Sequence, residues 1–282
     1  MQKVVLVTGT STGLGISIVV KLANLGYKVF ATMRNLEKKA QLEAAATNLG
    51  VDISIKQLDV QDGESIDRCV SEIIAEQGHI DVLVNNAGAG FIRTTEQATE
   101  DEINWVMDVN FMGVVRCTKA VLPHMRLARS GHVVNVSSVG GLVGQPFNEI
   151  YCAAKFALEG YVESVSTYIT PNFNVNFTNV EPGGIQSEFA SNALAQFQGT
   201  GGMADDEYRP ILENYIAGAQ NRTEGVYQTS DEVADVVIGC IESSEPPIRI
   251  RTSDWSNEFC ELKTQADPTG KLQQQKIIDT LM

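Results

Sequence analysis

Two side chains in the middle of the chain are of types that can hold and pass on a proton. Tyr151 and Lys155 fall in a segment with helical periodicity, residues 151–170, and a spacing of four puts both on one face of a helix. Ser138 comes shortly before them, at the end of a run that predicts a strand, His132–Ser137. A hydroxyl at the carboxyl edge of such a sheet lies where α/β proteins bind ligands. A tyrosine and a lysine four apart are usually solvated, so the meaning of this pair depends on its surroundings.

A glycine-rich turn follows the first apolar run. The chain reads Thr8-Gly9-Thr10-Ser11-Thr12-Gly13-Leu14-Gly15 after the strand expected at residues 4–8, and a helix is expected to follow. Glycines permit a tight turn and let the backbone approach a pyrophosphate. The helix N-terminus adds free N–H groups and the positive end of its dipole. Any strand-to-helix turn can use glycine, but dinucleotide sites lie at the first such junction, so the turn predicts one.

The residue after the second expected strand bears on the choice of cofactor. Dehydrogenases that use NAD place a carboxylate there to hold the ribose 2′-hydroxyl, whereas this chain has Met33 followed by Arg34. A guanidinium can bind a 2′-phosphate in bidentate fashion, and a carboxylate would repel it. An ordinary solvated arginine is the alternative interpretation. The sequence favours NADP(H), with an NAD-dependent enzyme as the alternative.

The elements that must position these groups alternate between short apolar runs and amphipathic stretches. Strands are expected at residues 4–8, 28–33, 53–58, 82–85, 132–137 and 175–180, and helices at 15–25, 36–48, 65–77, 99–129 and 151–170. This alternation predicts right-handed crossovers and an α/β fold with a doubly wound parallel sheet of the Rossmann type. No linker divides the chain, so residues 1–282 are expected to form a single dinucleotide-binding domain.

The later part of the chain changes character. Residues 187–229 contain several aromatic side chains and a Gly199-Thr-Gly-Gly202 stretch, and they are expected to form an insertion over the carboxyl end of the sheet. A helix at Asp231–Glu242, a last strand at Ile248–Arg251 and a polar C-terminal tail, 253–282, are expected to follow.

Taken in order, the motifs resemble the single-domain branch of the short-chain dehydrogenase/reductase family over residues 3–250. They are Thr8-Gly9-xxx-Gly13-x-Gly15, Leu58-Asp59-Val60, Asn85-Asn86-Ala87-Gly88, Asn110, Ser138, Tyr151-xxx-Lys155 and Pro182-Gly183. Within the family, Met33-Arg34, Glu245-Pro-Pro-Ile-Arg249 and Asp267-Pro-Thr-Gly270 look like the 17β-hydroxysteroid and retinol dehydrogenase group. The resemblance implies hydride transfer between a nicotinamide cofactor and a ketone or secondary alcohol.

The resemblance also implies catalytic roles. Tyr151 would be the acid–base, and the ammonium of Lys155, with the positive nicotinamide of the oxidised complex, would lower the phenol's pKa. Ser138 would hydrogen-bond the substrate oxygen. Asn110, unfavourable inside a helix, would disturb the backbone and carry a water to Lys155. Ser137 lies on the opposite face of its strand and is left out of the site.

Cofactor contacts are expected along the same edge of the sheet. Asp59 and Val60 would border the adenine, and Asn86 would support the cofactor. Ser187 stands where the family often has threonine, and its hydroxyl would meet the nicotinamide carboxamide. The full set is Gly9, Ser11, Thr12, Gly13, Leu14, Gly15, Arg34, Asp59, Val60, Asn86, Ala87, Gly88, Tyr151, Lys155, Pro182, Gly183, Ile185 and Ser187.

The segment between the catalytic serine and tyrosine bears on the substrate. Residues 139–147 are apolar or glycine except for Gln145, and no lysine or arginine lies between Lys155 and Arg209 to clamp a charged group. An apolar face of the insertion could close over the site as a mobile lid of residues 187–225, formed by Phe189, Phe197, Tyr208, Ile211, Leu212 and Tyr215. These aromatics could equally serve only to pack the insertion onto the domain. We expect a bulky, lipophilic, uncharged substrate; a catalytically idle nucleotide sensor is the alternative from another class.

Composition narrows the remaining possibilities. The formal net charge of −14 argues against nucleic acid and membrane surfaces as partners. Five scattered cysteines indicate reduced, packed thiols, and the three histidines lack metal-ligand spacing, so no metal site is expected. With neither a signal peptide nor a membrane-length apolar run, a cytoplasmic location is expected. Apolar positions on the long helices favour a homodimer or homotetramer.

Overall fold

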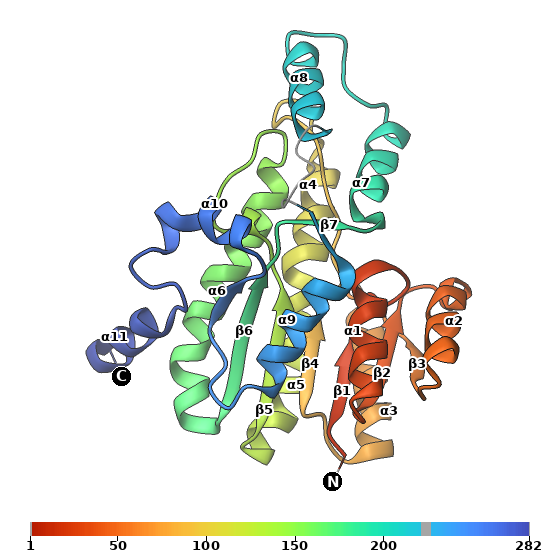
Figure 1. Ribbon diagram of the computed structural model, residues 1–282, viewed down its shortest axis with the longest axis vertical. Coiled ribbons are helices and arrows are strands. Elements are labelled where there is room, and N and C mark those ends of the chain that lie inside the picture. Colours follow the sequence, from red (N-terminus) through yellow and green to blue (C-terminus); the bar gives the residue numbers. More distant parts are fainter. Residues whose placement is uncertain (1, 221–226, 282) are drawn as a thin grey trace.

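The computed structural model describes residues 2–220 and 227–281, and a seven-stranded parallel sheet forms its centre (Figure 1). The strand order is β3-β2-β1-β4-β5-β6-β9. The strands are β1 (Val4–Val7), β2 (Lys28–Met33), β3 (Ser54–Gln57), β4 (Val82–Asn85), β5 (Gly131–Val136), β6 (Val175–Glu181) and β9 (Arg249–Arg251). The order reverses between β1 and β4, which makes that crevice the topological switch point where such sheets bind ligands. The predicted doubly wound fold is confirmed.

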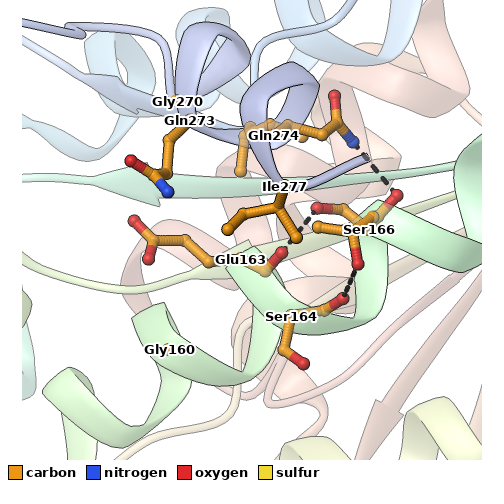
Figure 2. Close-up of a pocket in the computed structure, with 10 residues that line it drawn as sticks. Gly160, Glu163, Ser164, Ser166, Gly270, Gln273, Gln274 and Ile277 are labelled. Carbon is orange, nitrogen blue, oxygen red and sulfur yellow. Dashed lines mark hydrogen bonds between the residues drawn. The ribbon is translucent and has the colours of Figure 1, made fainter. Parts of the chain in front are cut away.

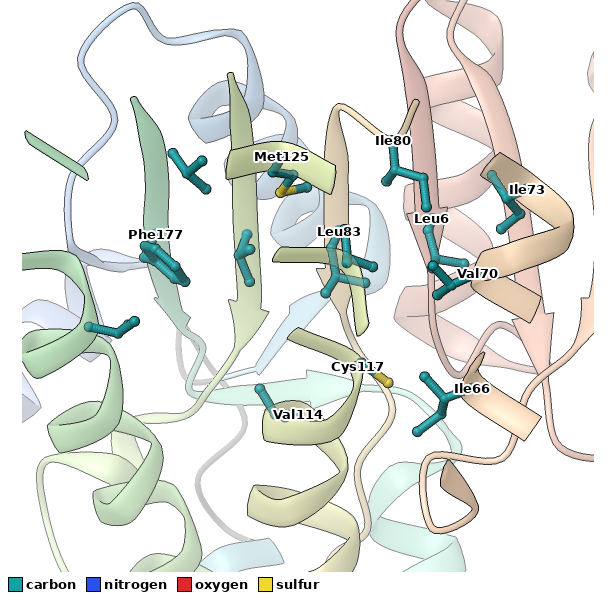
Figure 3. Close-up of a cluster of buried hydrophobic side chains, with 14 of the residues drawn as sticks. Leu6, Ile66, Val70, Ile73, Ile80, Leu83, Val114, Cys117, Met125 and Phe177 are labelled. Atoms are coloured by element: carbon teal, nitrogen blue, oxygen red, sulfur yellow. The ribbon is translucent and has the colours of Figure 1, made fainter. Parts of the chain in front are cut away.

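Helices cover both faces of the sheet. One face carries α1 (Gly13–Asn24), α2 (Ala40–Leu49) and α9 (Ser230–Glu242), and the other carries α3 (Gly63–Gln77), α5 (Gly113–Ala128) and α6 (Glu149–Phe173). Alternate residues of each strand serve the two layers: Val4 and Leu6 of β1 point to the second group of helices, and Val5 and Val7 to the first. Figure 3 shows the second layer, where Leu6, Leu83 and Phe177 meet side chains of α3 and α5. Both faces are buried, which explains the unbroken apolar runs.

Local signals set the ends of several helices. Asp62 caps α3 by accepting hydrogen bonds from the backbone N–H groups of Glu64 and Ser65. Thr229 begins α9 with a capping box that Glu232 completes. Gly50 ends α2 at φ 64°, a left-handed conformation that glycine adopts without strain.

The long helix predicted over residues 99–129 is wrong as a single element. The structure divides it into α4 (Glu100–Met107), a π-helical turn at Asp108–Met112 and α5. The turn surrounds Asn110, whose side-chain amide donates a 3.0 Å hydrogen bond to the carbonyl of Val106. A side chain that competes for backbone groups in this way favours a local change of helical pitch.

The predicted insertion contains two helices that rise above the carboxyl edge of the sheet, α7 (Glu188–Gly199) and α8 (Arg209–Gln220) (Figure 1). A short parallel pair that the sequence analysis did not predict, β7 (Gly184–Gln186) with β8 (Tyr227–Thr229), flanks them. Residues 221–226 of the predicted insertion lie outside the described residues.

The polar tail is structured where it is described. It forms α10 (Asp254–Thr264) and α11 (Lys271–Leu281). A Ser253 capping box begins α10, and the helix buries Cys260 against Val139 and Leu142, just after Ser138. Trp255, Phe259 and Leu262 of α10 follow helical spacing, a signal that the sequence analysis missed.

The last helix, α11, lies against α6 and leaves a hollow between them (Figure 2). Gln274 of α11 crosses to α6 and donates a 3.0 Å hydrogen bond to the carbonyl of Ser166. None of the predicted catalytic residues lines this hollow. Within the described ranges, no helix combines the length and the apolar character that crossing a membrane requires.

Candidate active site

The carboxyl end of β5 leads directly to Ser138, the serine predicted to be catalytic. Ser138 begins a short helical turn at Val139–Gly141, and its Oγ accepts a 2.9 Å hydrogen bond from the N–H of Gly140. A Cβ at Gly140 would lie 3.3 Å from both Ser138 Oγ and Tyr151 Cε1. The bare glycine therefore lets the serine hydroxyl and the phenol ring come together.

Tyr151 and Lys155 stand one turn apart on α6, as their spacing predicts. Lys155 Nζ lies 5.8 Å from the centroid of the Tyr151 ring. The same nitrogen donates a 2.9 Å hydrogen bond to the carbonyl of Val136, the last residue of β5. The lysine thus joins the catalytic helix to the strand that carries Ser138.

Burial has the largest effect on the pKa values of both Tyr151 and Lys155. It raises the pKa of Tyr151 to about 12, against the hydrogen bond with Ser138, which lowers it. It lowers the pKa of Lys155 to about 8, and the charge of Glu159 acts the other way. The protein's own groups therefore do not give the lowered tyrosine pKa that we expected, because loss of solvent disfavours the phenolate.

Asn110 sits against the loop after β4. Its side-chain amide donates a 2.9 Å hydrogen bond to the carbonyl of Ala89, and its Oδ1 accepts a 3.0 Å bond from the N–H of the same residue. A Cβ at Gly88 would lie 3.1 Å from Asn110 Oδ1 and 3.8 Å from Lys155 Nζ. Asn110 and Lys155 therefore flank the same glycine.

The phosphate-binding turn is built for close approach. Gly9 has φ 70°, and a Cβ there would lie 2.6 Å from Ala87 Cα. Gly15 meets the carbonyl of Gly9 so closely that its Cβ would lie 2.4 Å from that oxygen. Asn86 fixes the turn by donating hydrogen bonds to the carbonyls of Thr8 (3.0 Å) and Gly9 (2.8 Å). The glycine turn is thus joined to the motif Asn85-Asn86-Ala87-Gly88.

The N-terminus of α1 leaves donors for an anion. Thr12 is its N-cap residue but makes no side-chain capping hydrogen bond, and the first turn holds no acidic residue. Free N–H groups and the positive dipole end at a glycine turn fit a pyrophosphate. The residues present therefore fit a dinucleotide.

Arg34 follows β2 as predicted and is exposed, and no carboxylate in the described part of the chain forms an ion pair with it. Sequence reasoning missed two neighbours of this region. A hollow beside Ser11 and Thr12 is lined by Lys38 and Glu188, and Gln41 Nε2 donates a 3.4 Å hydrogen bond to Glu188. Exposed charges far apart in the chain gave no pattern from which to find them.

The residues predicted to border the adenine and the nicotinamide lie in segments that follow strands at the carboxyl edge of the sheet. Asp59 Oδ1 accepts a 3.0 Å hydrogen bond from the N–H of Gln61, and the carbonyl of Val60 accepts one from Arg116. Pro182 follows β6 and accepts a 3.0 Å hydrogen bond from the N–H of Val139. This bond joins the turn at Pro182, predicted to border the nicotinamide, to the loop that follows Ser138.

Ser187, predicted to meet the nicotinamide carboxamide, stands at the start of the insertion. It is the N-cap residue of α7, and its Oγ accepts a 3.4 Å hydrogen bond from the N–H of Phe189. A Cβ at Gly13 would lie 3.1 Å from Ser187 Cβ, so the start of the insertion abuts the phosphate turn. Ile185, in β7, packs partly buried against the layer that contains α1 and α9.

The insertion contacts the predicted catalytic tyrosine. The ring of Phe189 packs edge-on against Tyr151, with centroids 5.9 Å apart. Phe197 and Leu212 join Phe147 in a buried cluster with Tyr215 at its side. The single apolar face that we predicted is wrong for two members: Ile211 is 56% exposed, and Tyr208 hydrogen-bonds Glu96.

Arg93 is a second feature that sequence reasoning missed. Its buried guanidinium pairs with Glu102 at 3.0 Å, donates to the carbonyl of Gly202 at 2.5 Å and lies 5.2 Å from the centroid of the Phe197 ring. It therefore fastens the loop after β4 to the insertion. An arginine directly after Phe91-Ile92 was the available signal.

Comparison with known proteins agrees with this geometry. The family model described as short chain dehydrogenase matches residues 3–197. Retinol dehydrogenase 8 of Bos taurus is 40% identical over 279 residues, with 96% of this chain and 87% of the relative covered. The type 1 17-beta-hydroxysteroid dehydrogenase of Homo sapiens is 35% identical over 275 residues, covering 95% and 83%. A crystallised short-chain dehydrogenase from Streptomyces avermitilis superposes with a TM-score of 0.78 at 28% identity, covering 98% of both chains.

The chain belongs to the short-chain dehydrogenase family. It is an oxidoreductase that lies near the 17β-hydroxysteroid and retinol dehydrogenase group, which confirms the resemblance drawn from the motifs.

Proposed function

We propose that the protein is an NADP(H)-dependent reductase of bulky, lipophilic ketones, which also oxidises the corresponding secondary alcohols. The observation that carries this proposal is the convergence of Ser138, Tyr151 and Lys155 at one edge of the sheet, beneath the aromatic ring of Phe189.

The protein's own residues would handle the substrate oxygen. A bound nicotinamide supplies or accepts the hydride. Ser138 would donate a hydrogen bond to the carbonyl oxygen, and Tyr151 would give that oxygen its phenolic proton as negative charge develops. The nearby Lys155 ammonium would stabilise the phenolate that remains and then give it a proton, and Asn110 would hold a water that restores the proton to the lysine.

The cofactor preference rests on charge at the end of β2. Arg34 is exposed beside the switch point without an ion-pair partner in the described part, and Lys38 lines the hollow that begins at Ser11. Two cations here would attract a 2′-phosphate. Glu188 lines the same hollow, and its carboxylate would repel that phosphate. This observation makes an NAD-dependent enzyme the second candidate.

The preference for a lipophilic substrate rests on the walls of the site. Phe189 meets the catalytic ring, and Phe147 and Phe197 are buried in the cluster beside it. Arg93, whose guanidinium lies 5.2 Å from the centroid of the Phe197 ring, is already held by Glu102 and two backbone carbonyls, so it is not available to a substrate carboxylate. Among the described residues, apolar walls beside a cation that is already paired fit an uncharged ligand. The retinol and hydroxysteroid dehydrogenases named above support the same substrate class.

One assay tests cofactor and substrate together. Cofactor absorbance is followed with NADPH and NADH separately, across steroids, retinoids, aliphatic ketones, quinones and small keto acids. We expect the highest kcat/KM for NADPH with a steroid- or retinoid-sized carbonyl. A clear preference for a charged keto acid would overturn the substrate proposal, and equal or better use of NADH would overturn the cofactor proposal. No turnover with any carbonyl would favour the nucleotide sensor.

A further inference from the structure

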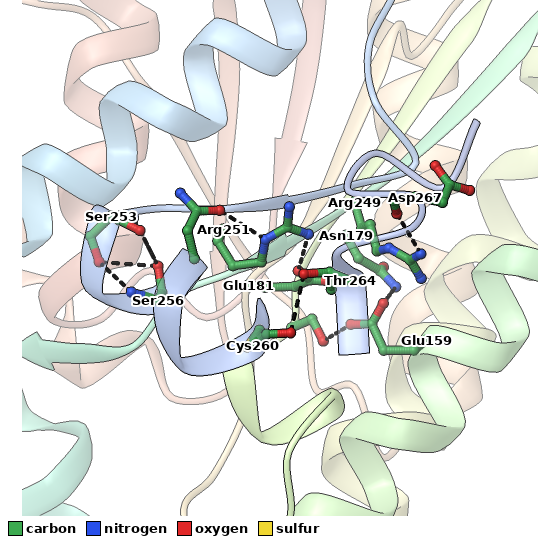
Figure 4. Close-up of polar contacts among 12 residues, drawn as sticks. Glu159, Asn179, Glu181, Arg249, Arg251, Ser253, Ser256, Cys260, Thr264 and Asp267 are labelled. Carbon is green, nitrogen blue, oxygen red and sulfur yellow. Dashed lines mark hydrogen bonds and ion pairs between the residues drawn. The ribbon is translucent and has the colours of Figure 1, made fainter. Parts of the chain in front are cut away.

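Behind the catalytic residues lies a buried polar cluster that the proposed reaction does not use (Figure 4). Glu159 follows Lys155 by one turn of α6, and Glu181 ends β6; the two side chains are 6% and 0% exposed as residues. Glu159 Oε1 accepts a hydrogen bond from Ser137 Oγ, and its Oε2 accepts a 2.7 Å bond from Asn179 Nδ2. Isolated carboxylates are rarely buried without a purpose, because desolvation is costly.

The carboxyl groups of Glu159 and Glu181 lie close enough for each to affect the pKa of the other. Burial raises the pKa of Glu159, and burial together with the charge of Glu159 raises that of Glu181 well above its ordinary value. Glu181 Oε1 has no hydrogen-bond donor among the described side chains, so a proton on one of the two carboxyl groups would supply the missing donor. One proton between them would leave the pair with a single negative charge.

Cations stand on both sides of this pair. Arg251 of β9 pairs with Glu181 at 3.2 Å, and Arg249 contributes its charge from the same strand. On the other side lies Lys155, whose pKa the charge of Glu159 raises against burial. The remaining titratable groups that face the cluster are Tyr151 beside the lysine and the thiol of Cys260 on α10.

Glu159 also braces the loop that carries the catalytic serine. A Cβ at Gly141 would lie 3.0 Å from Glu159 Cγ and 3.1 Å from its Oε1, so the loop rests directly on the carboxyl group. Ser137, which donates to that group, immediately precedes Ser138 in the chain. Glu159 therefore contacts the loop of Ser138 and lies one helical turn from Lys155.

We propose that Glu159 is a positioning residue of the reaction: sharing one proton with Glu181, it keeps a single negative charge behind Lys155, stabilises the ammonium and anchors the loop of Ser138. This inference rests on the proposed function, because it acts through Lys155 and Ser138.

The first test is the pH profile of ketone reduction. Glu159→Gln keeps the shape of the side chain and removes its negative charge, so Lys155 should lose its proton at a lower pH than in the wild type. We expect the alkaline limb of kcat/KM to move down by about one pH unit, and kcat near neutral pH to fall at least about tenfold with KM little changed. Glu181→Gln leaves Glu159 ionised, so the alkaline limb of kcat/KM in this variant should stay within a few tenths of a pH unit of the wild-type limb.

A matched control lies on the same helix. Glu163→Gln removes a carboxylate one turn beyond Glu159, where it pairs with Arg249 at 2.7 Å on a partly exposed surface. Its profile should match wild type. A Glu159→Gln enzyme whose limb coincides with that of Glu163→Gln would overturn the inference.

The second test needs neither turnover nor a foldable Glu159 variant. Infrared spectra of the wild-type protein at pH 5.5 and at pH 7.5 should both show a protonated-carboxyl C=O band. The band should survive Glu163→Gln and disappear in Glu181→Gln. Absence of the band in the wild type at pH 7.5, or its survival in Glu181→Gln, would contradict the shared proton.

The two tests separate this inference from the function on which it rests. A wild-type protein that reduces no carbonyl but shows the band would refute the proposed reaction while retaining the carboxyl pair. An active wild-type enzyme without the band would refute the pair alone.

Discussion

The ring of Phe189 packs edge-on against the ring of Tyr151 at a centroid distance of 5.9 Å. The two residues belong to different parts of the fold, since Phe189 opens the first helix of the insertion and Tyr151 stands on the central helix α6. The insertion therefore contacts the proposed acid–base directly, and the chemistry of the site should respond to changes in either partner.

Replacing Phe189 by alanine should affect large substrates selectively. Loss of an aromatic contact costs about 1 kcal/mol, so kcat/KM for a steroid-sized ketone should fall about fivefold, while a small aliphatic ketone should lose much less. Leu194→Ala is the matched control, because Leu194 lies on the same helix and is equally exposed, at 41%. Equal losses for both substrates would argue against a direct contact with the ligand.

Replacing Tyr151 by phenylalanine keeps the ring and removes the transferable proton. Carbonyl reduction should fall by roughly two to four orders of magnitude, with cofactor affinity nearly intact. Turnover is measured by cofactor absorbance and binding by fluorescence titration. Reduction at the wild-type rate would show that another group supplies the proton.

Exchanging Arg34 for aspartate replaces attraction by repulsion at the expected position of the 2′-phosphate. Binding of NADPH should weaken about 10- to 100-fold, and binding of NADH much less. Titration with each cofactor distinguishes the two. Parallel losses for NADPH and NADH would mean that the arginine does not contact the phosphate.

His132 should make the folded protein sensitive to acid. Burial, with the charges of Lys271 and Lys3, lowers its pKa to about 4, and its Nε2 lies 2.9 Å from Thr178 Oγ1. The unfolded chain therefore binds the proton more readily, so this contribution to stability is complete above about pH 6.5 and is lost as pH falls toward 4. The loss should be on the order of 3 kcal/mol.

Denaturant unfolding at a series of pH values measures this effect. His132→Gln retains a donor toward Thr178 but does not titrate in this range. Its free energy of unfolding should change less between pH 6.5 and 4 than that of the wild type. Identical pH dependence in both proteins would assign the acid sensitivity to other groups.

We also predict a symmetric assembly through α5 and α6. These helices expose large apolar side chains, with Phe156 at 42% and Tyr168 at 45% on α6. Light scattering at micromolar concentration should give the mass of a dimer or tetramer, and Phe156→Glu should reduce it. Leu262→Glu, at a 98% exposed position on α10, should leave the mass unchanged. A monomeric wild-type mass would disprove the prediction.

The sequence predicted what depends on local pattern. The strands of the central sheet, to within one residue at each end, the glycine turn and the helical spacing of Tyr151 and Lys155 all follow from short-range periodicity or steric demands, and the structure has them. The break in the helix around Asn110 was foreseen as a disturbance but not as a π-helical turn, because the pitch depends on a contact with Ala89.

What the sequence could not predict depends on distant contacts between residues that look ordinary in isolation. Arg93 meets Gly202, and Lys38 meets the region of Glu188, across long stretches of chain. The raised pKa of Tyr151 likewise comes from burial, which a motif does not describe. Burial and long-range pairing are properties of the folded chain as a whole.

The position of α10 bears on how the protein is made. Cys260 of this helix covers Val139 and Leu142, which lie in the loop after Ser138, the proposed catalytic serine. During synthesis from the N-terminus, the sheet up to β6 can assemble well before residues 254–264 leave the ribosome. The nascent chain would hold its cofactor turn early, but the serine loop would gain its cover only near the end of translation. Competence to react would then be among the last properties that the growing chain acquires.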